Sequence, residues 1–240
     1  MKSVFKFYNS KGWKKTTQHF EDANINEDLR INAREYVSKC RRRILRYIPK
    51  KGENILDFAS GPIQYKEYLL YSKNFRYRHC VDFSKEAIKA AKIKIGKKGK
   101  FYCNDFLNIN FKKNFFDCII SIHTIYHINR QKQKQAVKKL LDISKKNKPI
   151  IIIYSNPSTI INTIKSLIFF KKIKNFLLNK KSYKQKIYFN CHTIDWWKQF
   201  DNEANIEFYP WRSFSSLPQK ILIPNNYLGR KIFNFLFYLE

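Results

Sequence analysis

The chain has 240 residues, which is enough for one large α/β domain with a substantial buried core. Its formal net charge is +30, and it holds five cysteines with no Cys-x-x-Cys pair. The odd number and the spacing of the cysteines argue against a disulfide framework and a zinc knuckle, and they favour a reducing cytoplasm. The N-terminus has no long apolar run followed by a small-residue cleavage site, so we expect no secretory signal.

The positive charge has two interpretations. A strongly basic protein attracts polyanions such as nucleic acid or an anionic membrane surface. Lysine, however, far outnumbers arginine, and Ile, Asn, Phe and Tyr are abundant, which is the residue set that A/T-rich codons favour. We therefore expect much of the charge to be spread over the surface. The densest basic cluster, residues 39–46, is expected to be a solvated helix face.

A regular alternation of apolar strands and amphipathic helices follows an N-terminal extension of about 50 residues. Apolar side chains at helical spacing from Ala33 to Ile48 predict that the extension ends in a helix, which Pro49 stops. The predicted elements after it are a strand that ends at Asp57, a helix 62–70, a strand 77–81, a helix 84–95 capped by Ser84, strands 100–103 and 115–121, a helix 130–144 and a strand 149–154. Such βαβ repetition forms a parallel sheet with helices on both faces. The continuous apolar run 150–154 predicts a buried central strand.

The first of these strands runs directly into a turn of small residues. It ends in Asp57, and Ala59, Ser60 and Gly61 then allow the backbone to approach a ligand closely. Open α/β sheets bind their ligands at the carboxyl ends of the strands. The next strand ends in Asp82, and an acidic side chain at this separation accepts hydrogen bonds from both hydroxyls of a ribose. The pattern predicts a cofactor that contains a nucleoside.

The turn also excludes two classes of nucleotide site. A single glycine between residues 57 and 63 disfavours a dinucleotide pyrophosphate, and the chain has no Gly-Lys-Ser/Thr run for ATP hydrolysis. The sequence resembles the class I S-adenosylmethionine-dependent methyltransferases, and the resemblance covers roughly residues 50 to 156. Four motifs carry it in order, namely 57–61 (DFASG), 81–84 (VDFS), 103–106 (CNDF) and 116–121 (FDCIIS).

The resemblance implies a Rossmann-like doubly wound fold and S-adenosylmethionine as the cofactor. It implies that the loop from Asp57 through Ala59 and Ser60 to Gly61 holds the methionine end of the cofactor. The other cofactor-binding positions that it implies are Asp82 for the ribose, Phe83 for one face of the adenine, Asp105 for the adenine amino group, and the neighbouring strand-end residues Asn104 and Ser121. Ala59 stands where the family commonly has its first loop glycine. The alternatives are that Asp82 caps the following helix and that Phe83 belongs to the core.

The segment after the fourth strand offers a general base. An oxygen acceptor must lose a proton, and His123 is the first candidate to take it, ahead of His127 and Tyr126. The alternative is that His123 only orients the loop or the substrate. The segment lacks the Asn/Asp-Pro-Pro-Tyr/Phe signature with which amino-methylating nucleic-acid enzymes resemble one another, which favours a small-molecule or saccharide hydroxyl. We expect no metal, because the two histidines have no third ligand nearby.

The chain changes character at residue 157. Apolar residues at helical spacing alternate with lysines over 157–180, which predicts a basic amphipathic insertion. It is either a helical cap over the active site or, through 158–180, a peripheral membrane contact. Residues 205–211 predict a late strand, and 221–223 is the one candidate for the final strand of the antiparallel hairpin that the resemblance implies. A second group of polar and aromatic residues follows the insertion: His192, Trp196, Trp197, Trp211 and Arg212.

These observations predict three parts, 1–50, 51–156 and 157–240. They are an N-terminal helical extension, a cofactor-binding core, and a helical cap with the C-terminal part of the sheet. The predicted function is methyl transfer from S-adenosylmethionine to a small molecule or saccharide, most plausibly at oxygen, in the cytoplasm. Two other hypotheses stand beside it: an RNA methyltransferase that uses the basic surface, and a non-catalytic module that keeps the fold.

Overall fold

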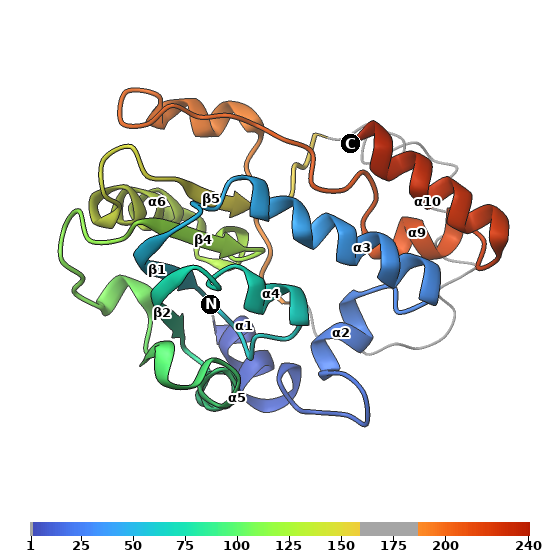
Figure 1. Cartoon of the computed structure of the whole chain (residues 1–240), viewed down its shortest axis with the longest axis horizontal. Helices are drawn as coiled ribbons and strands as arrows, with labels where there is room; N and C mark the ends of the chain where they lie inside the picture. Colours follow the sequence, from blue (N-terminus) through green and yellow to red (C-terminus); the bar gives the residue numbers. More distant parts are fainter. Residues whose placement is uncertain (1, 159–186) are drawn as a thin grey trace.

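The structure is a computed structural model, and it describes residues 2–158 and 187–240 (Figure 1). The predicted amphipathic segment and its membrane-facing stretch, 158–180, lie almost wholly outside the described residues. The helices are α1 (Lys2–Phe7), α2 (Glu21–Asn26), α3 (Ile31–Arg43), α4 (Lys66–Leu70), α5 (Lys85–Ile95), α6 (Arg130–Ile143), α9 (Ser216–Leu222) and α10 (Tyr227–Leu239). The strands are β1 (Gly52–Phe58), β2 (Phe75–Asp82), β3 (Gly99–Cys103), β4 (Cys118–Ile122) and β5 (Ile150–Ile153).

The five strands form one parallel sheet in the order β3-β2-β1-β4-β5. The order reverses at β1, because the chain first builds outward through β2 and β3 and then returns to β4 on the other side. All the carboxyl ends therefore meet at one edge, and the switch point lies between β1 and β4. This confirms the predicted Rossmann-like fold.

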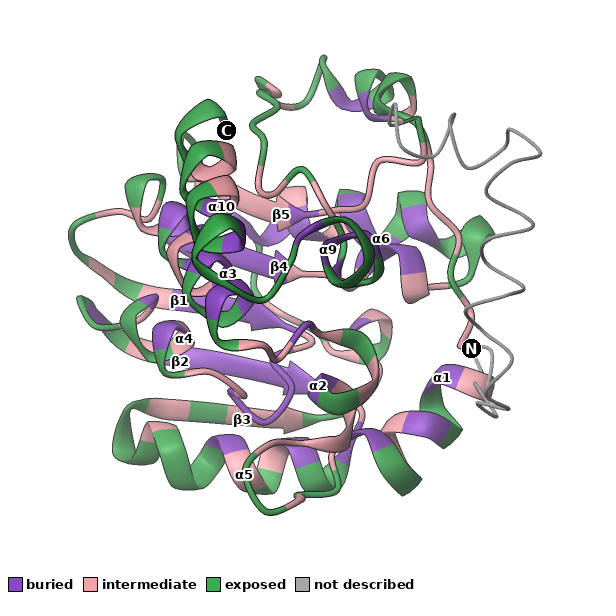
Figure 2. Ribbon diagram, turned by 90° about the vertical axis from the view of Figure 1, so that its right-hand side faces the viewer, coloured by how far each residue is buried: buried purple, intermediate pink, exposed green. Residues whose placement is uncertain are grey.

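Apolar side chains alternate along the central strands and build a core on each face of the sheet. On one face Leu56 and Ile119 pack against Leu140 of α6. On the other face Ile55 and Ile120 pack with residues after α3 and α4. The sheet is thus covered on both sides, and Figure 2 shows β1, β2 and β4 coloured mostly as buried.

The predicted central position of the fifth strand is wrong. β5 lies at the edge of the sheet in the part of the chain that the structure describes, and three of its four residues are only half-buried. Neither predicted late strand forms there: residues 205–211 have no regular secondary structure, and 221–223 lie at the end of α9. Phe208 and Tyr209 are about half exposed, so this stretch gains little from burial.

Two helix predictions had different outcomes. Ser84 caps α5 as predicted, because its Oγ accepts a hydrogen bond from the backbone N–H of Ala87 at 3.4 Å. The helix predicted to start at Pro62 begins only at Lys66, because the chain continues as a turn through Ile63, whose φ is +50°. A left-handed backbone at a β-branched residue is incompatible with a helix start.

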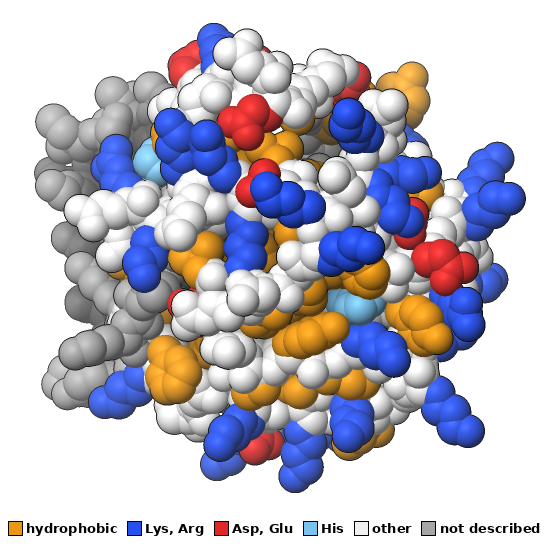
Figure 3. Space-filling model, turned by 90° about the vertical axis from the view of Figure 1, so that its left-hand side faces the viewer, with side chains coloured by type: hydrophobic (Ala, Val, Ile, Leu, Met, Phe, Trp, Pro, Cys, Tyr) orange, Lys and Arg blue, Asp and Glu red, His pale blue; other side chains and the backbone are white. Residues whose placement is uncertain are grey.

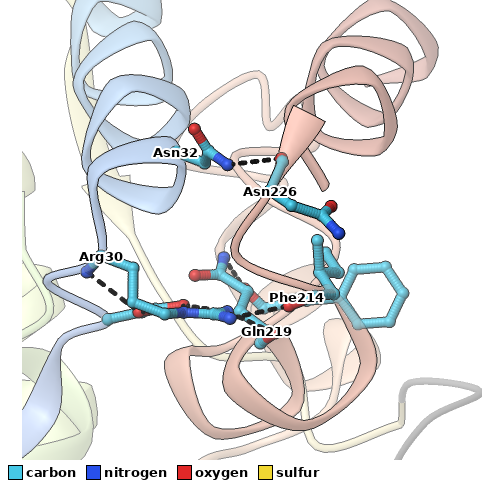
Figure 4. Close-up of polar contacts among 7 residues, drawn as sticks. Arg30, Asn32, Phe214, Gln219 and Asn226 are labelled. Atoms are coloured by element: carbon cyan, nitrogen blue, oxygen red, sulfur yellow. Dashed lines mark hydrogen bonds and ion pairs between the residues drawn. The ribbon is translucent and has the colours of Figure 1, made fainter. Parts of the chain in front are cut away.

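The two ends of the chain pack against each other. In Figure 1 the C-terminal helices α9 and α10 lie beside α3. Figure 4 shows the polar contacts at this junction. The guanidinium of Arg30 donates to the carbonyl oxygens of Ile223 at 2.7 Å and Gln219 at 2.8 Å, and Asn32 donates to that of Asn226 at 2.8 Å. These bonds satisfy carbonyl groups at the end of α9 and before α10.

The basic cluster on α3 is not the solvated face that we expected. Arg42 and Arg46 are exposed, but Arg41 and Arg43 are only 5% and 8% exposed. Arg43 donates to the carbonyl oxygens of Trp211 and Phe237 and pairs with Glu240 at 2.9 Å. A buried charge requires such partners, so this part of α3 is an internal anchor.

The remaining charge is spread out over the face seen in Figure 3, where Lys and Arg side chains are interspersed with apolar and acidic ones. None of the helices in residues 2–158 and 187–240 combines the length and the apolar character needed to cross a membrane.

Candidate functional site

The carboxyl edge of the sheet brings together the polar residues that the sequence placed at strand ends. Asp57 and Asp82 lie near the ends of the paired strands β1 and β2, and Ser121 of β4 is level with Phe58 of β1. Asn104 follows β3, and its backbone N–H donates to the Asp82 carbonyl at 3.1 Å. Four neighbouring parallel strands therefore contribute to one edge of the sheet, as the sequence predicted.

The turn after β1 adopts an unusual backbone. Ala59 and Gly61 have φ values of +57° and +55°. Glycine tolerates this conformation without a steric penalty, whereas alanine does not. The backbone N–H of Ser60 donates to the Val81 carbonyl at 3.0 Å, which ties the turn to the end of β2. The turn thus has a left-handed backbone at both positions, although alanine stands at the first of them.

Asp82 holds this turn and the start of α5 together. One carboxylate oxygen accepts the backbone N–H of Gly61 at 3.0 Å, and the other accepts that of Ser84 at 2.8 Å. Burial raises the pKa of Asp82 to about 6, although these backbone N–H groups favour the ionised form. The alternative role that we considered for Asp82, at the start of the helix, is therefore present. It does not exclude ribose binding, because a carboxylate accepts several hydrogen bonds.

Asp57 has a partner inside the protein. Its carboxylate forms a buried ion pair with the guanidinium of Arg78 on β2, with Nε at 3.2 Å from Oδ2. Arg78 also donates to the carbonyl of Tyr68. The pair fixes the end of β1 against β2, so Asp57 positions the turn, and its contact with a cofactor stays a prediction.

The other predicted cofactor residues lie around the end of β3 and the start of α5. Asp105 caps a short 3-10 helix, because its Oδ1 accepts the backbone N–H of Leu107 at 3.0 Å. Asn104 is exposed and bonds the backbone of Asp105. Phe83 is half-buried, and its ring lies 5.5 Å from that of Phe5, so it is not a residue of the central core.

The N-terminal segment covers this edge of the sheet, which sequence reasoning missed. The rings of Tyr8 and Trp13 stack at 4.7 Å, and the indole of Trp13 lies over Gly61, 3.2 Å from where a Cβ would be. Burial, together with the nearby Asp22, raises the pKa of Tyr8. Aromatic residues in the first 13 positions were the available signal, but nothing in their spacing indicated what they cover.

The segment after β4 presents the three predicted catalytic residues. His123 has a φ of +57°, and its ring lies 6.4 Å from that of Tyr126. Burial, the charge of Arg212 and further positive neighbours lower the pKa of His123 to about 3. His127 is held elsewhere, because its Nδ1 donates to the carbonyl of Tyr188 at 2.7 Å. Of the two histidines, His123 has no hydrogen bond to a ring nitrogen in the described part of the chain.

The polar and aromatic residues that follow the predicted insertion lie in two separate places. The ring of Trp211 contacts that of His123 at 4.8 Å, and the guanidinium of Arg212 lies 4.8 Å over the Trp211 ring. Trp197 belongs to the core beneath α6, and His192 stacks on Trp196 at 4.3 Å. A cleft of about 2010 Å³ opens along β5, and His123, Trp211 and Arg212 are among the residues that line it.

A family model described as a methyltransferase domain matches residues 56–152. This range contains β2, β3 and β4 whole, parts of β1 and β5, and all four predicted motifs. The chain contains a class I methyltransferase domain. No curated protein matches the sequence. The turn of Ala59 and Gly61 lies inside the matched region of the methyltransferase domain, as do Asp82 and His123.

Solved structures share the fold of the methyltransferase domain. Phosphoethanolamine N-methyltransferase 1 of Haemonchus contortus, in complex with phosphoethanolamine and S-adenosylhomocysteine, is 14% identical with a TM-score of 0.54, over 66% of this chain and 33% of that one. N-methyltransferase NodS of Bradyrhizobium japonicum WM9, bound to S-adenosylhomocysteine, is 12% identical with a TM-score of 0.51, over 65% and 75%. DhpI, bound to S-adenosylmethionine, is 13% identical with a TM-score of 0.52, over 70% and 72%.

The residues at the carboxyl edge fit the cofactor of this family. The Oγ of Ser121 is buried and has no hydrogen-bond partner in the described part of the chain, and the Nε1 of Trp13 above Gly61 is also unpaired. Buried polar atoms of this kind normally have partners, so the site has unused hydrogen-bonding capacity where a nucleoside is expected. Within residues 2–158 and 187–240, no three potential ligands gather as a metal site requires.

Proposed function

We propose that this methyltransferase domain transfers a methyl group from S-adenosylmethionine to a small-molecule or saccharide acceptor, at oxygen. The observation that carries the proposal is the position of His123. It follows β4 at the carboxyl edge, contacts Trp211 and lines the cleft. On the one face that Figure 3 shows, cations are interspersed with apolar and acidic side chains, so that face offers no continuous basic surface for a phosphate backbone.

The residues of the chain have distinct proposed roles. We expect the turn from Ala59 to Gly61 and the carboxylate of Asp82 to hold the cofactor, with Phe83 and Asp105 at its adenine. S-Adenosylmethionine supplies a methyl group on a positively charged sulfur, so the protein itself does not have to activate the donor. Its remaining tasks are to align the acceptor and exclude water. The aromatic cover formed by Tyr8 and Trp13 suits the exclusion of water.

His123 is proposed to take the proton from the acceptor hydroxyl. With a pKa lowered to about 3, its imidazole is neutral at physiological pH and has a free lone pair. The same lowering of the pKa makes the imidazole a weak base. Proton transfer to it therefore depends on the charged groups that lie next to His123 when the acceptor is bound.

The test is a labelling experiment with a conservative variant. The protein is incubated with methyl-labelled S-adenosylmethionine and, in separate reactions, with fractionated small-molecule extracts and with total RNA, and the labelled product is identified. We expect His123→Asn to lower turnover about 100-fold, because asparagine tolerates the positive φ but cannot accept the proton. Cofactor affinity should stay unchanged. A variant with full turnover would remove His123 as the base, and labelled RNA in place of a small molecule would replace the proposed acceptor.

A further inference from the structure

Two arginines have buried nitrogen atoms without hydrogen-bond partners in the described part of the chain. Nη1 of Arg212 and Nε of Arg41 are buried, and neither makes a hydrogen bond in the part of the chain that the structure describes. Unpaired buried N–H groups on a cation are energetically unfavourable. Arg43, two residues further along the same helix as Arg41, is also buried, but it pairs with Glu240 and two carbonyl oxygens. Unpaired N–H groups are therefore not a property of every buried arginine in this part of the fold.

The two arginines differ in how they are held. Arg41 donates through Nη2 to Glu27 at 2.8 Å, and its guanidinium lies 3.3 Å from the centre of the Tyr65 ring. Arg212 makes no ion pair within the described residues, and its guanidinium lies on the Trp211 ring. Stacking on aromatic rings fixes the plane of a guanidinium while its N–H groups remain free at the edge. Both side chains are thus oriented before any ligand binds.

Arg212 lies beside His123, whereas Arg41 is not among the residues that line the cleft. Trp211 connects Arg212 to His123, because its ring contacts the imidazole at 4.8 Å and the guanidinium at the same distance. After burial, the charge of Arg212 is the largest influence that lowers the pKa of His123. Arg212, Trp211 and His123 also share the wall of one cleft.

We infer that the acceptor carries an oxyanion group, a carboxylate or a phosphate, which binds to Arg212 beside His123. This inference rests on the proposed function and narrows its acceptor to an anionic hydroxy compound. A guanidinium edge matches either oxyanion, because both present two oxygens to parallel N–H groups. Binding would satisfy the unpaired Nη1 of Arg212. It would also offset the charge of Arg212 and make His123 a stronger base only when substrate is present.

A titration of the full chain with inorganic phosphate and, separately, with acetate tests the site directly. We expect at least one anion to bind saturably in the millimolar range and to move the ring NMR resonances of His123. We expect Arg212→Gln to weaken this binding at least 10-fold and Arg212→Lys to retain part of it. The matched control is Arg76→Gln, which removes an exposed arginine paired with Glu53 on the outer part of the sheet. Absence of saturable binding, or equal binding by Arg212→Gln, would overturn the inference.

A second measurement separates this inference from the proposed function. Methyl-labelled products from the extract experiment are passed over an anion exchanger. Retention of the main product supports an anionic acceptor. A main product that is not retained would overturn the oxyanion site while methyl transfer stands. If no extract yields a labelled product, the proposed function is contradicted, and the anion titration still decides whether Arg212 binds an oxyanion.

Discussion

Three residues around the carboxyl edge, Ala59, Ile63 and His123, have a left-handed backbone although they are not glycine. Such a conformation is unfavourable for residues with a Cβ and persists only where the surrounding structure imposes it. Ile63 is 1% exposed and packs against Cys80 and Ala91, so core contacts hold it in place. Ala59 and His123 lie on turns directly after β1 and β4. The strain is thus concentrated where the ligands are expected.

Replacing Ala59 by glycine tests this strain. The left-handed conformation disfavours alanine by about 1–2 kcal/mol, and glycine loses about 0.5–1 kcal/mol through its greater freedom in the unfolded chain. We therefore expect Ala59→Gly to raise the free energy of unfolding by up to about 1 kcal/mol in a urea titration. The control Ala91→Gly, in the middle of α5, should lower it. A loss of stability for Ala59→Gly that equals the loss for the control would show that the turn is not strained.

At the scale of elements, the sequence predicted the strands and helices that recur along the chain. The alternation of strands and helices from 54 to 154 follows from hydrophobic periodicity and short turns, and the parallel sheet follows from the βαβ order. The position of β5 at the edge was not predictable, because an apolar run does not show whether a neighbouring strand exists. The same reason explains why the strand predicted at 205–211 does not form. The residue pattern suits a strand, but Pro210 lacks a backbone N–H donor, and no strand in the described part of the chain pairs with this segment.

Helical periodicity did contain a signal for Arg41 that the composition obscured. Arg41 is four residues after Val37 and three before Ile44, both of which are buried, so it lies on the apolar face of α3. Arg41 belongs to a run of three arginines, and charge alone does not show which of them are buried. Arg212 could not be predicted as a neighbour of His123 because 89 residues separate them and only the tertiary fold joins them.

His79 links three strands and should make stability depend on pH. Its ring nitrogens contact Asn54 of β1 at 2.9 Å and Tyr102 of β3 at 3.1 Å. Burial and the charge of Lys100 lower its pKa to about 4. The unfolded chain therefore takes up a proton below about pH 6.5 that the folded state excludes, so the contribution of His79 is lost as the pH falls from about 6.5 to 4.

We expect His79→Gln to flatten this loss. Unfolding free energies measured between pH 7.5 and 4.5 should fall less steeply for His79→Gln than for the wild-type protein. Asp82, whose pKa is raised to about 6, has the opposite trend, but it is common to both proteins and cancels in the difference. Parallel curves for the two proteins would show that His79 titrates normally in the folded state.

At the scale of the whole molecule, both ends of the chain converge on the methyltransferase domain. The N-terminal rings of Tyr8 and Trp13 cover the turn after β1, and the C-terminal residues Trp211 and Arg212 lie beside His123. The resemblance predicted the strand-end positions because they are local motifs on a repeating fold. It could not predict these contacts, because long-range packing outside the motifs determines them. The expected cofactor-binding positions thus follow mainly from the sequence, and the proposed acceptor site follows from the structure.

The central claim is that the strand ends form a site for S-adenosylmethionine with Asp82 at its ribose. Calorimetric titration with S-adenosylmethionine and S-adenosylhomocysteine tests it most directly. We predict that the wild-type protein and the exposed control Asp201→Ala bind both compounds equally well. We predict that Asp82→Ala weakens binding by about 2–3 kcal/mol, the loss expected for hydrogen bonds to a charged acceptor. Absence of binding by the wild-type protein, or unchanged affinity of Asp82→Ala, would contradict the account.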